Sequence, residues 1–127
     1  MNIISDSITG QTDDFIAKLN PNLIDKQIEL YEGFSLDHLR PGEPHLFILP
    51  SYEEYPHFEE ALEVVEFLGK ENIVGIVGTG NINFDDLYLV TAKRLAEATG
   101  LPLLHGFEFS GTPKDVDIVE SILRQDK

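Results

Sequence analysis

The chain has 127 residues, of which 42% are apolar, and this length predicts a single domain over residues 1–127 with one buried core. Its 23 acidic residues outnumber its 9 lysines and arginines, and the net charge of −14 would repel nucleic acid and anionic membranes, serving either solubility or attraction of a basic partner. The absence of cysteine excludes disulfides, thiolate catalysis and zinc–thiolate sites, and since no signal-peptide pattern and no apolar run of ~20 residues is found, we expect a cytoplasmic protein.

Five apolar runs predict β-strands. Two of them, Leu46–Leu49 and Ile73–Val77, are almost continuously apolar, which is typical of strands buried on both faces of a parallel sheet. In chain order, the predicted strands are Met1–Ser5, Gln27–Tyr31, His45–Leu49, Ile73–Val77 and Pro102–Phe109.

Helical patterns lie between these runs. A first helix after the first strand places Phe15, Ile16 and Leu19 on one face, and later apolar stripes predict helices over His57–Leu68 and Asp86–Thr99. Gly100 is expected to end the latter helix. A last helix begins at Thr112-Pro113-Lys114-Asp115, because threonine suits an N-cap, proline the first helical position and aspartate the positive helix end.

Alternation of strands and helices predicts a three-layer α/β sandwich. The segment from Asn20 to Pro44 is expected to hold the second strand together with a loop or short turn in place of a full helix. Five parallel strands in the order 2-1-3-4-5 would form a flavodoxin-like fold, in which ligands bind at the carboxyl ends of the strands.

The turn between the first strand and the first helix is the strongest candidate for an anion site. This phosphate turn contains three hydroxyls and a glycine but no lysine or arginine, so that neutral donors and the helix N-terminus would hold a phosphate. The alternative is that the hydroxyls only cap the helix. The predicted phosphate-binding residues are Ser7, Ile8, Thr9, Gly10, Gln11 and Thr12.

Two more loops are expected at the same edge of the sheet, which we call the tyrosine loop (Ser51–Pro56) and the asparagine loop (Thr79–Asp86). A flat heteroaromatic ring needs apolar walls and amide groups at its polar edge. Tyr52 or Tyr55 would cover one face of such a ring and Phe84 the other, while the backbone near Gly80 and the side chains of two asparagines would reach the edge. The candidate ring-binding residues are Ser51, Tyr52, Glu53, Tyr55, Thr79, Gly80, Asn81, Asn83, Phe84 and Asp85.

Each of these residues also has a purely structural alternative. Phe84 would equally suit the core, the tyrosines would suit an exposed loop, and the asparagines would stabilise a turn. We expect no catalytic residue and no metal site, because the acidic residues near His57 lack a compact ligand spacing and the other histidines are scattered.

Three segments of the sequence resemble the NrdI family of flavodoxin-like proteins. They are Asp6–Gln11, Gly80–Phe84 and Phe107–Thr112, the last followed by Asp115-Val116, and they occur in the family's order. One departure is that the tyrosine loop carries two glutamates and no glycine, where the family commonly has glycine.

The resemblance implies bound FMN and a partner, the metal-carrying small subunit of a class Ib ribonucleotide reductase. In this family the reduced flavin reacts with dioxygen and delivers an oxidant that helps to assemble the partner's dimanganese–tyrosyl radical cofactor. A separate flavin reductant, not identified by the sequence, is also implied. Two alternatives stay open: a general flavodoxin-type one-electron carrier, and a flavin-free interaction module with the same fold.

Overall fold

The computed structural model describes residues 1–6, 10–52, 54–81, 83 and 88–125. Within them lies one sheet with strands in the order β2-β1-β3-β4-β5, and each neighbouring pair is parallel. The predicted parallel sheet and its strand order are therefore confirmed. The strands are β1 (Asn2–Ser5), β2 (Lys26–Glu29), β3 (His45–Leu49), β4 (Ile73–Gly80) and β5 (Leu103–Glu108).

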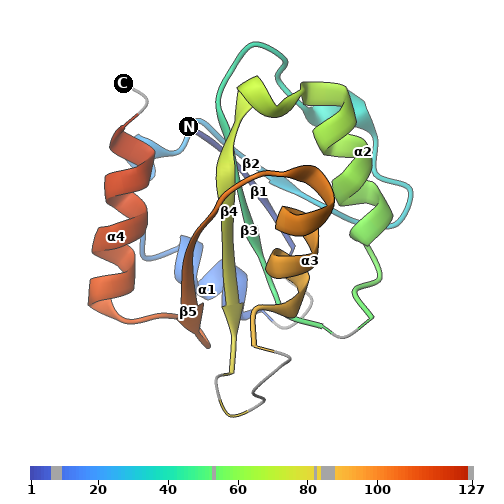
Figure 1. Ribbon diagram of the computed structural model, residues 1–127. Coiled ribbons are helices and arrows are strands. Elements are labelled where there is room, and N and C mark those ends of the chain that lie inside the picture. The colour runs from blue at the N-terminus through green and yellow to red at the C-terminus, as the bar shows by residue number, and fades with distance from the viewer. Residues whose placement is uncertain (7–9, 53, 82, 84–87, 126–127) are drawn as a thin grey trace.

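Helices cover both faces of this sheet, as Figure 1 shows, with α1 and α4 on one side and α2 and α3 on the other. The three-layer arrangement predicted from the sequence is thus present. The α-helices are α1 (Gln11–Ile16), α2 (Phe58–Leu68), α3 (Val90–Thr99) and α4 (Pro113–Arg124), and short 3-10 helices span Pro21–Leu23, Leu36–His38 and Lys70–Asn72. As expected, the region from Asn20 to Pro44 contains β2 and short turns but no α-helix.

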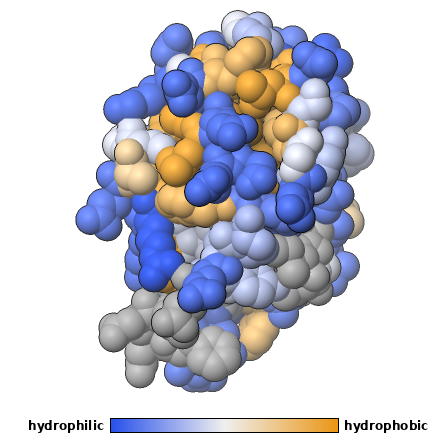
Figure 2. Space-filling model, turned by 90° about the vertical axis from the view of Figure 1, so that its right-hand side faces the viewer, coloured by the Kyte–Doolittle hydropathy of each residue, from blue (hydrophilic) through white to orange (hydrophobic). Residues whose placement is uncertain are grey.

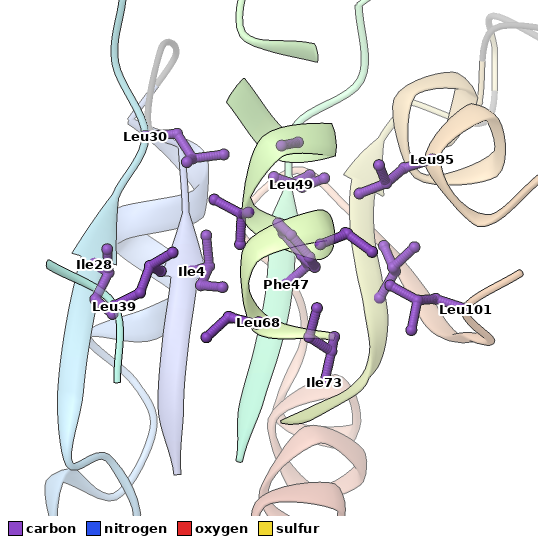
Figure 3. Close-up of a cluster of buried hydrophobic side chains, with 14 of the residues drawn as sticks. Ile4, Ile28, Leu30, Leu39, Phe47, Leu49, Leu68, Ile73, Leu95 and Leu101 are labelled. Carbon is purple, nitrogen blue, oxygen red and sulfur yellow. The ribbon is translucent and has the colours of Figure 1, made fainter. Parts of the chain in front are cut away.

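The core divides into two clusters, one on each face of the sheet. Phe47 and Leu49 of β3 point toward the face covered by α2 and α3, where they meet residues such as Leu68 and Leu95 (Figure 3). On the other face, Phe15 of α1 stacks on Phe107 of β5 with ring centroids 4.0 Å apart. Alternating side chains of the central strands therefore supply both clusters, which explains their continuous apolar character.

Several element boundaries differ from the predicted ones. The second strand is Lys26–Glu29 rather than Gln27–Tyr31. Helix α1 ends at Ile16, so Leu19 is buried although it lies after the end of the helix. The third helix was expected from Asp86, but α3 begins at Val90 because Leu89 has a left-handed backbone with φ 58° that no helix accepts. Residues 84–87 lie outside the described part of the chain.

The fourth strand is longer than predicted, since β4 continues through Gly78 and Thr79 to Gly80. The sequence indicated a turn there because of its glycines. In the structure Gly78 leaves room for Ala92 and Leu89, and Gly106 of the neighbouring strand leaves room for Leu89, because a Cβ at either glycine would crowd these side chains. The carboxyl ends of β1, β3 and β4 therefore meet at one edge of the sheet, the lower edge in Figure 1.

Candidate cofactor site

The predicted phosphate turn leads into the N-terminus of α1. Gly10 is the N-cap residue with φ 81°, a left-handed conformation that glycine adopts without strain, and no side chain caps the helix there. Ser7, Ile8 and Thr9 lie outside the described residues. The backbone N–H groups of the first turn have no helical partners, which is the ordinary basis of anion binding at such an end.

Thr12 provides the most informative polar atom of this turn. Its side chain is fully buried, and its hydroxyl oxygen has no hydrogen-bond partner within the described part of the chain. Leaving a buried hydroxyl unsatisfied costs about 1–3 kcal/mol. An oxyanion bound in the turn would remove this cost, so the residues present fit a phosphate group.

The tyrosine loop is attached to the asparagine loop and to α3. Ser51 donates its hydroxyl hydrogen bond to the carbonyl oxygen of Thr79 at 2.6 Å, which brings two predicted site residues together. The hydroxyl of Thr91 accepts from the N–H of Tyr52 at 2.9 Å and lies 3.3 Å from its carbonyl oxygen. The ring of Tyr52 is partly exposed, whereas Glu53 is not among the described residues.

Tyr55 takes a position that the sequence did not indicate. It is 8% exposed and donates its hydroxyl hydrogen bond to the buried carboxylate of Asp6 at 2.6 Å. Burial, and then the hydrogen bond to Asp6, raise the pKa of Tyr55 far above its usual range. Tyr52 is consequently the more accessible of the two tyrosines expected beside a ring.

His57 contacts the same carboxylate oxygen of Asp6 through Nδ1 at 2.5 Å. Asp6, Tyr55 and His57 thus form a cluster that joins the end of β1 to the start of α2. Sequence reasoning missed it because 49 and 51 residues separate Asp6 from its two partners. No short-range spacing signals such a contact.

The asparagine loop begins on a fixed base. Thr79 is 2% exposed and donates its hydroxyl hydrogen bond to the carbonyl oxygen of Phe109 at 2.5 Å. The side-chain oxygen of Asn81 accepts from the N–H of Asn83 at 2.9 Å, so Asn81 at least stabilises the turn. Phe84 and Asp85 fall outside the described residues.

A cavity of about 340 Å³ lies beside the tyrosine loop, on its side toward α2 and α3. Half of its lining residues are aromatic, and the lining includes one cationic and one acidic side chain: Tyr52, Glu54, Tyr55, Phe58, Thr91 and Arg94. Among the described residues we find no cluster of three or more histidine, aspartate or glutamate side chains arranged to bind a metal. Nor does any helix in this part of the chain have the length and apolarity to cross a membrane.

The fold defines a flavodoxin-like protein, with a parallel sheet of order 2-1-3-4-5 and helices on both of its faces. The profile of the family described as NrdI flavodoxin like matches residues 3–121, and the chain belongs to this family. Family membership implies a flavin cofactor and supports a role tied to ribonucleotide reductase maturation.

Individual relatives agree with this assignment over nearly the whole chain. Protein NrdI of Bartonella tribocorum is 33% identical over 128 residues, covering 94% of this chain and 89% of the relative. Protein NrdI of Mesoplasma florum is 30% identical over 126 residues, covering 94% and 80%. Protein NrdI of Mycoplasmopsis pulmonis is 28% identical over 124 residues, covering 92% and 79%.

Proposed function

We propose that this chain is a cytoplasmic FMN-binding redox protein that supports assembly of the dimanganese–tyrosyl radical cofactor of a class Ib ribonucleotide reductase. Bound FMN would supply, in its reduced form, an oxidant derived from dioxygen. The partners would be the metal-carrying small subunit, which receives the oxidant, and a separate flavin reductant. The protein itself supplies binding, orientation and electrostatics.

The observation that carries the FMN proposal is the buried hydroxyl of Thr12 in the first turn of α1, which has no hydrogen-bond partner among the residues that the structure describes. A threonine that only packed against its neighbours would place its hydroxyl toward a carbonyl oxygen or solvent. Thr12 lies in the turn that binds a phosphate in flavodoxin-like folds. The turn contains no lysine or arginine that would bind the phosphate in place of neutral donors. Neutral donors therefore suit a phosphate here.

For the ring of the cofactor, we assign Tyr52 on the tyrosine loop, backbone groups near Gly80 and the side chains of Asn81 and Asn83. Ser51 and Thr79 hold the two loops at a fixed separation through their 2.6 Å hydrogen bond. Tyr55 contributes by packing beneath the loop, since its ring is buried. We retain Phe84 as the second wall of the ring site.

A titration with two flavins tests the cofactor proposal. FMN should bind and riboflavin, which lacks the phosphate, should bind at least tenfold more weakly. Thr12→Val removes the hydroxyl at nearly constant shape and should weaken FMN binding about tenfold, as expected for ~1.5 kcal/mol from a lost hydrogen bond to a charged group. Riboflavin binding should be unchanged, and Thr12→Ser should restore most of the FMN affinity.

The maturation role needs its own experiment. The reduced flavoprotein, dioxygen and a manganese-loaded class Ib small subunit should together yield tyrosyl radical, detected by electron paramagnetic resonance. If no radical forms while an authentic NrdI protein succeeds under the same conditions, the maturation role is wrong.

A general one-electron carrier is the second candidate. The tyrosine loop favours it, because its glutamates and its lack of glycine depart from the family's usual pattern. Such a carrier would bind FMN and reduce an acceptor protein, but it would not generate the radical. A colourless protein that ignores added FMN would exclude both candidates and leave a flavin-free module.

A further inference from the structure

Only two non-glycine residues in the described part of the chain have a positive φ, Leu89 at 58° and Phe109 at 53°. Residues other than glycine have a strained backbone in this conformation, and they keep it only where the surrounding structure imposes it. For Leu89 the reason is packing. The side chain is 6% exposed and fills the space that Gly78 and Gly106 leave between β4 and β5.

Phe109 has no comparable reason. Its side chain is 47% exposed, so the strained backbone does not serve to bury the ring. Phe109 is the second residue of a tight turn closed by the hydrogen bond from the N–H of Gly111 to the carbonyl oxygen of Glu108, at 2.9 Å. A positive φ at this position ordinarily selects glycine.

The turn is nevertheless held firmly in place. The N–H of Phe109 donates to the carbonyl oxygen of Gly80 at 3.1 Å, and its own carbonyl oxygen accepts from the Thr79 hydroxyl. The ammonium group of Lys18 donates to the carbonyl oxygen of Ser110 at 2.9 Å. The backbone is therefore fixed on both sides of a ring that stands in solvent.

The position of the ring is also informative. Thr79 and Gly80, which hold Phe109, are the last residues of β4 and lead directly into the asparagine loop. Phe109 itself follows the carboxyl end of β5. Residue 109 thus lies at the edge of the sheet where β4 and β5 end in Figure 1, the same edge as the candidate cofactor site.

We propose that Phe109 is an anchor residue for the protein partner. The inference rests on the proposed function and specifies which side chain engages the reductase small subunit. Exposed aromatic rings on a rigid backbone lose little entropy on binding and are common centres of protein interfaces. The partner surface that fits is an apolar pocket with a basic border, because Glu108 precedes Phe109 in the chain and the chain has a net charge of −14.

Phe109→Gly is the decisive variant. It removes the ring and at the same time relieves the strained φ, so a structural role and a docking role predict opposite results. We expect an unchanged or higher midpoint of thermal unfolding, FMN affinity within twofold of wild type, and binding to the manganese-loaded small subunit weakened at least tenfold, measured by isothermal titration calorimetry.

Phe67→Ala is the matched control. Phe67 has the same residue type and the same exposed fraction, 47%, but lies near the end of α2. Phe67 belongs to the last turn of α2, and in Figure 1 α2 ends in the upper part of the molecule, away from the lower edge where the strands end. This variant should bind the small subunit within twofold of wild type.

Four results would overturn the assignment. Wild-type affinity of Phe109→Gly for the small subunit would show that the ring is not an anchor. A loss of FMN affinity would assign the ring to the cofactor site, and a lower unfolding midpoint would show that it packs on the fold. If wild-type protein binds FMN but not the small subunit, the proposed partner itself is wrong, and the role of Phe109 is lost with it.

Discussion

At the scale of single residues, burial separates side chains that look alike in the sequence. Thr12 was one of several hydroxyl-bearing residues in a polar turn. The composition of that turn, and its position between the first strand and the first helix, predicted a phosphate site. Only the fold shows that the Thr12 hydroxyl oxygen is buried and has no hydrogen-bond partner in the described ranges of the chain. Tyr52 and Tyr55 were equivalent in the sequence, but the structure buries Tyr55 against Asp6 and leaves Tyr52 accessible.

Gly10 is predicted to matter for two separable reasons. Gly10→Ala forces a side chain into a φ of 81° and should lower the free energy of unfolding by about 1–2 kcal/mol. Gly33→Ala is a matched control, with φ 78° and no atom within 4 Å of the added Cβ, as at Gly10. Both variants should lose similar stability in urea titrations, but only Gly10→Ala should also weaken FMN binding. Equal FMN affinities for the two variants would contradict our placement of the phosphate.

Tyr55→Phe should destabilise the protein, because it removes a donor from the buried Asp6 carboxylate. The expected loss in the free energy of unfolding is about 1–3 kcal/mol. Tyr31→Phe serves as the comparison, since its hydroxyl lies 3.4 Å from His38 at an exposed site. Tyr31→Phe should change the free energy of unfolding by no more than about 0.5 kcal/mol. Equal effects would mean that the Asp6 cluster does not hold the tyrosine loop to β1.

At the scale of elements, periodicity predicted which segments form strands and helices, but it did not predict where long-range packing moves their ends. The start of α4 was predicted correctly because its capping signals lie close together in the sequence. Thr112 and Asp115 form the reciprocal capping box. The extension of β4 to Gly80 was not predicted, because the glycines of that strand leave room for side chains from other elements, Leu104 at Gly75, Ala92 and Leu89 at Gly78, and Ser51 at Gly80.

Asp115 links α4 to β5 through a 2.8 Å contact with His105. Burial acts to raise the pKa of the Asp115 carboxyl, but hydrogen bonds from Thr112 and His105 outweigh it and lower the pKa below its usual range. A group whose pKa is lowered on folding stabilises the fold above its unfolded pKa of about 3.9 and loses this contribution as pH falls through the folded value.

Asp115→Asn should therefore lower the free energy of unfolding by about 1 kcal/mol near neutral pH, the usual contribution of a helix cap. The decrease should become progressively smaller as the pH falls. Urea unfolding at a series of pH values measures the difference. Asp117→Asn on the exposed face of the same helix should have little effect at any pH. If the loss in the free energy of unfolding caused by Asp115→Asn is the same in acid as at neutral pH, the ionised carboxylate does not stabilise this helix cap.

At the scale of the whole molecule, the sequence predicted the layers and the strand order because alternation and continuous apolar strands leave few topologies. The surface is strongly acidic, with a net charge of −14. On the face that includes α2 and α3, hydrophilic side chains border an apolar area in the upper half of Figure 2. The charge had two interpretations, solubility and steering, and the fold alone does not distinguish them.

Steering predicts a salt-dependent rate of association with the small subunit. Raising the ionic strength from about 0.01 to 0.15 M shortens the screening length from about 30 to about 8 Å, and the association rate should fall about tenfold or more. Stopped-flow mixing with the small subunit measures this rate. The dissociation rate should change much less, and an association rate independent of salt would leave solubility as the role of the charge.

The phosphate turn is the basis of the proposed cofactor site, and a crystal structure of the chain with bound FMN would test this assignment. We predict that the Thr12 hydroxyl donates a hydrogen bond to a phosphate oxygen at the N-terminus of α1, with the ring between the tyrosine and asparagine loops. FMN bound elsewhere, or a Thr12 hydroxyl still without a partner in the complex, would contradict the central claim.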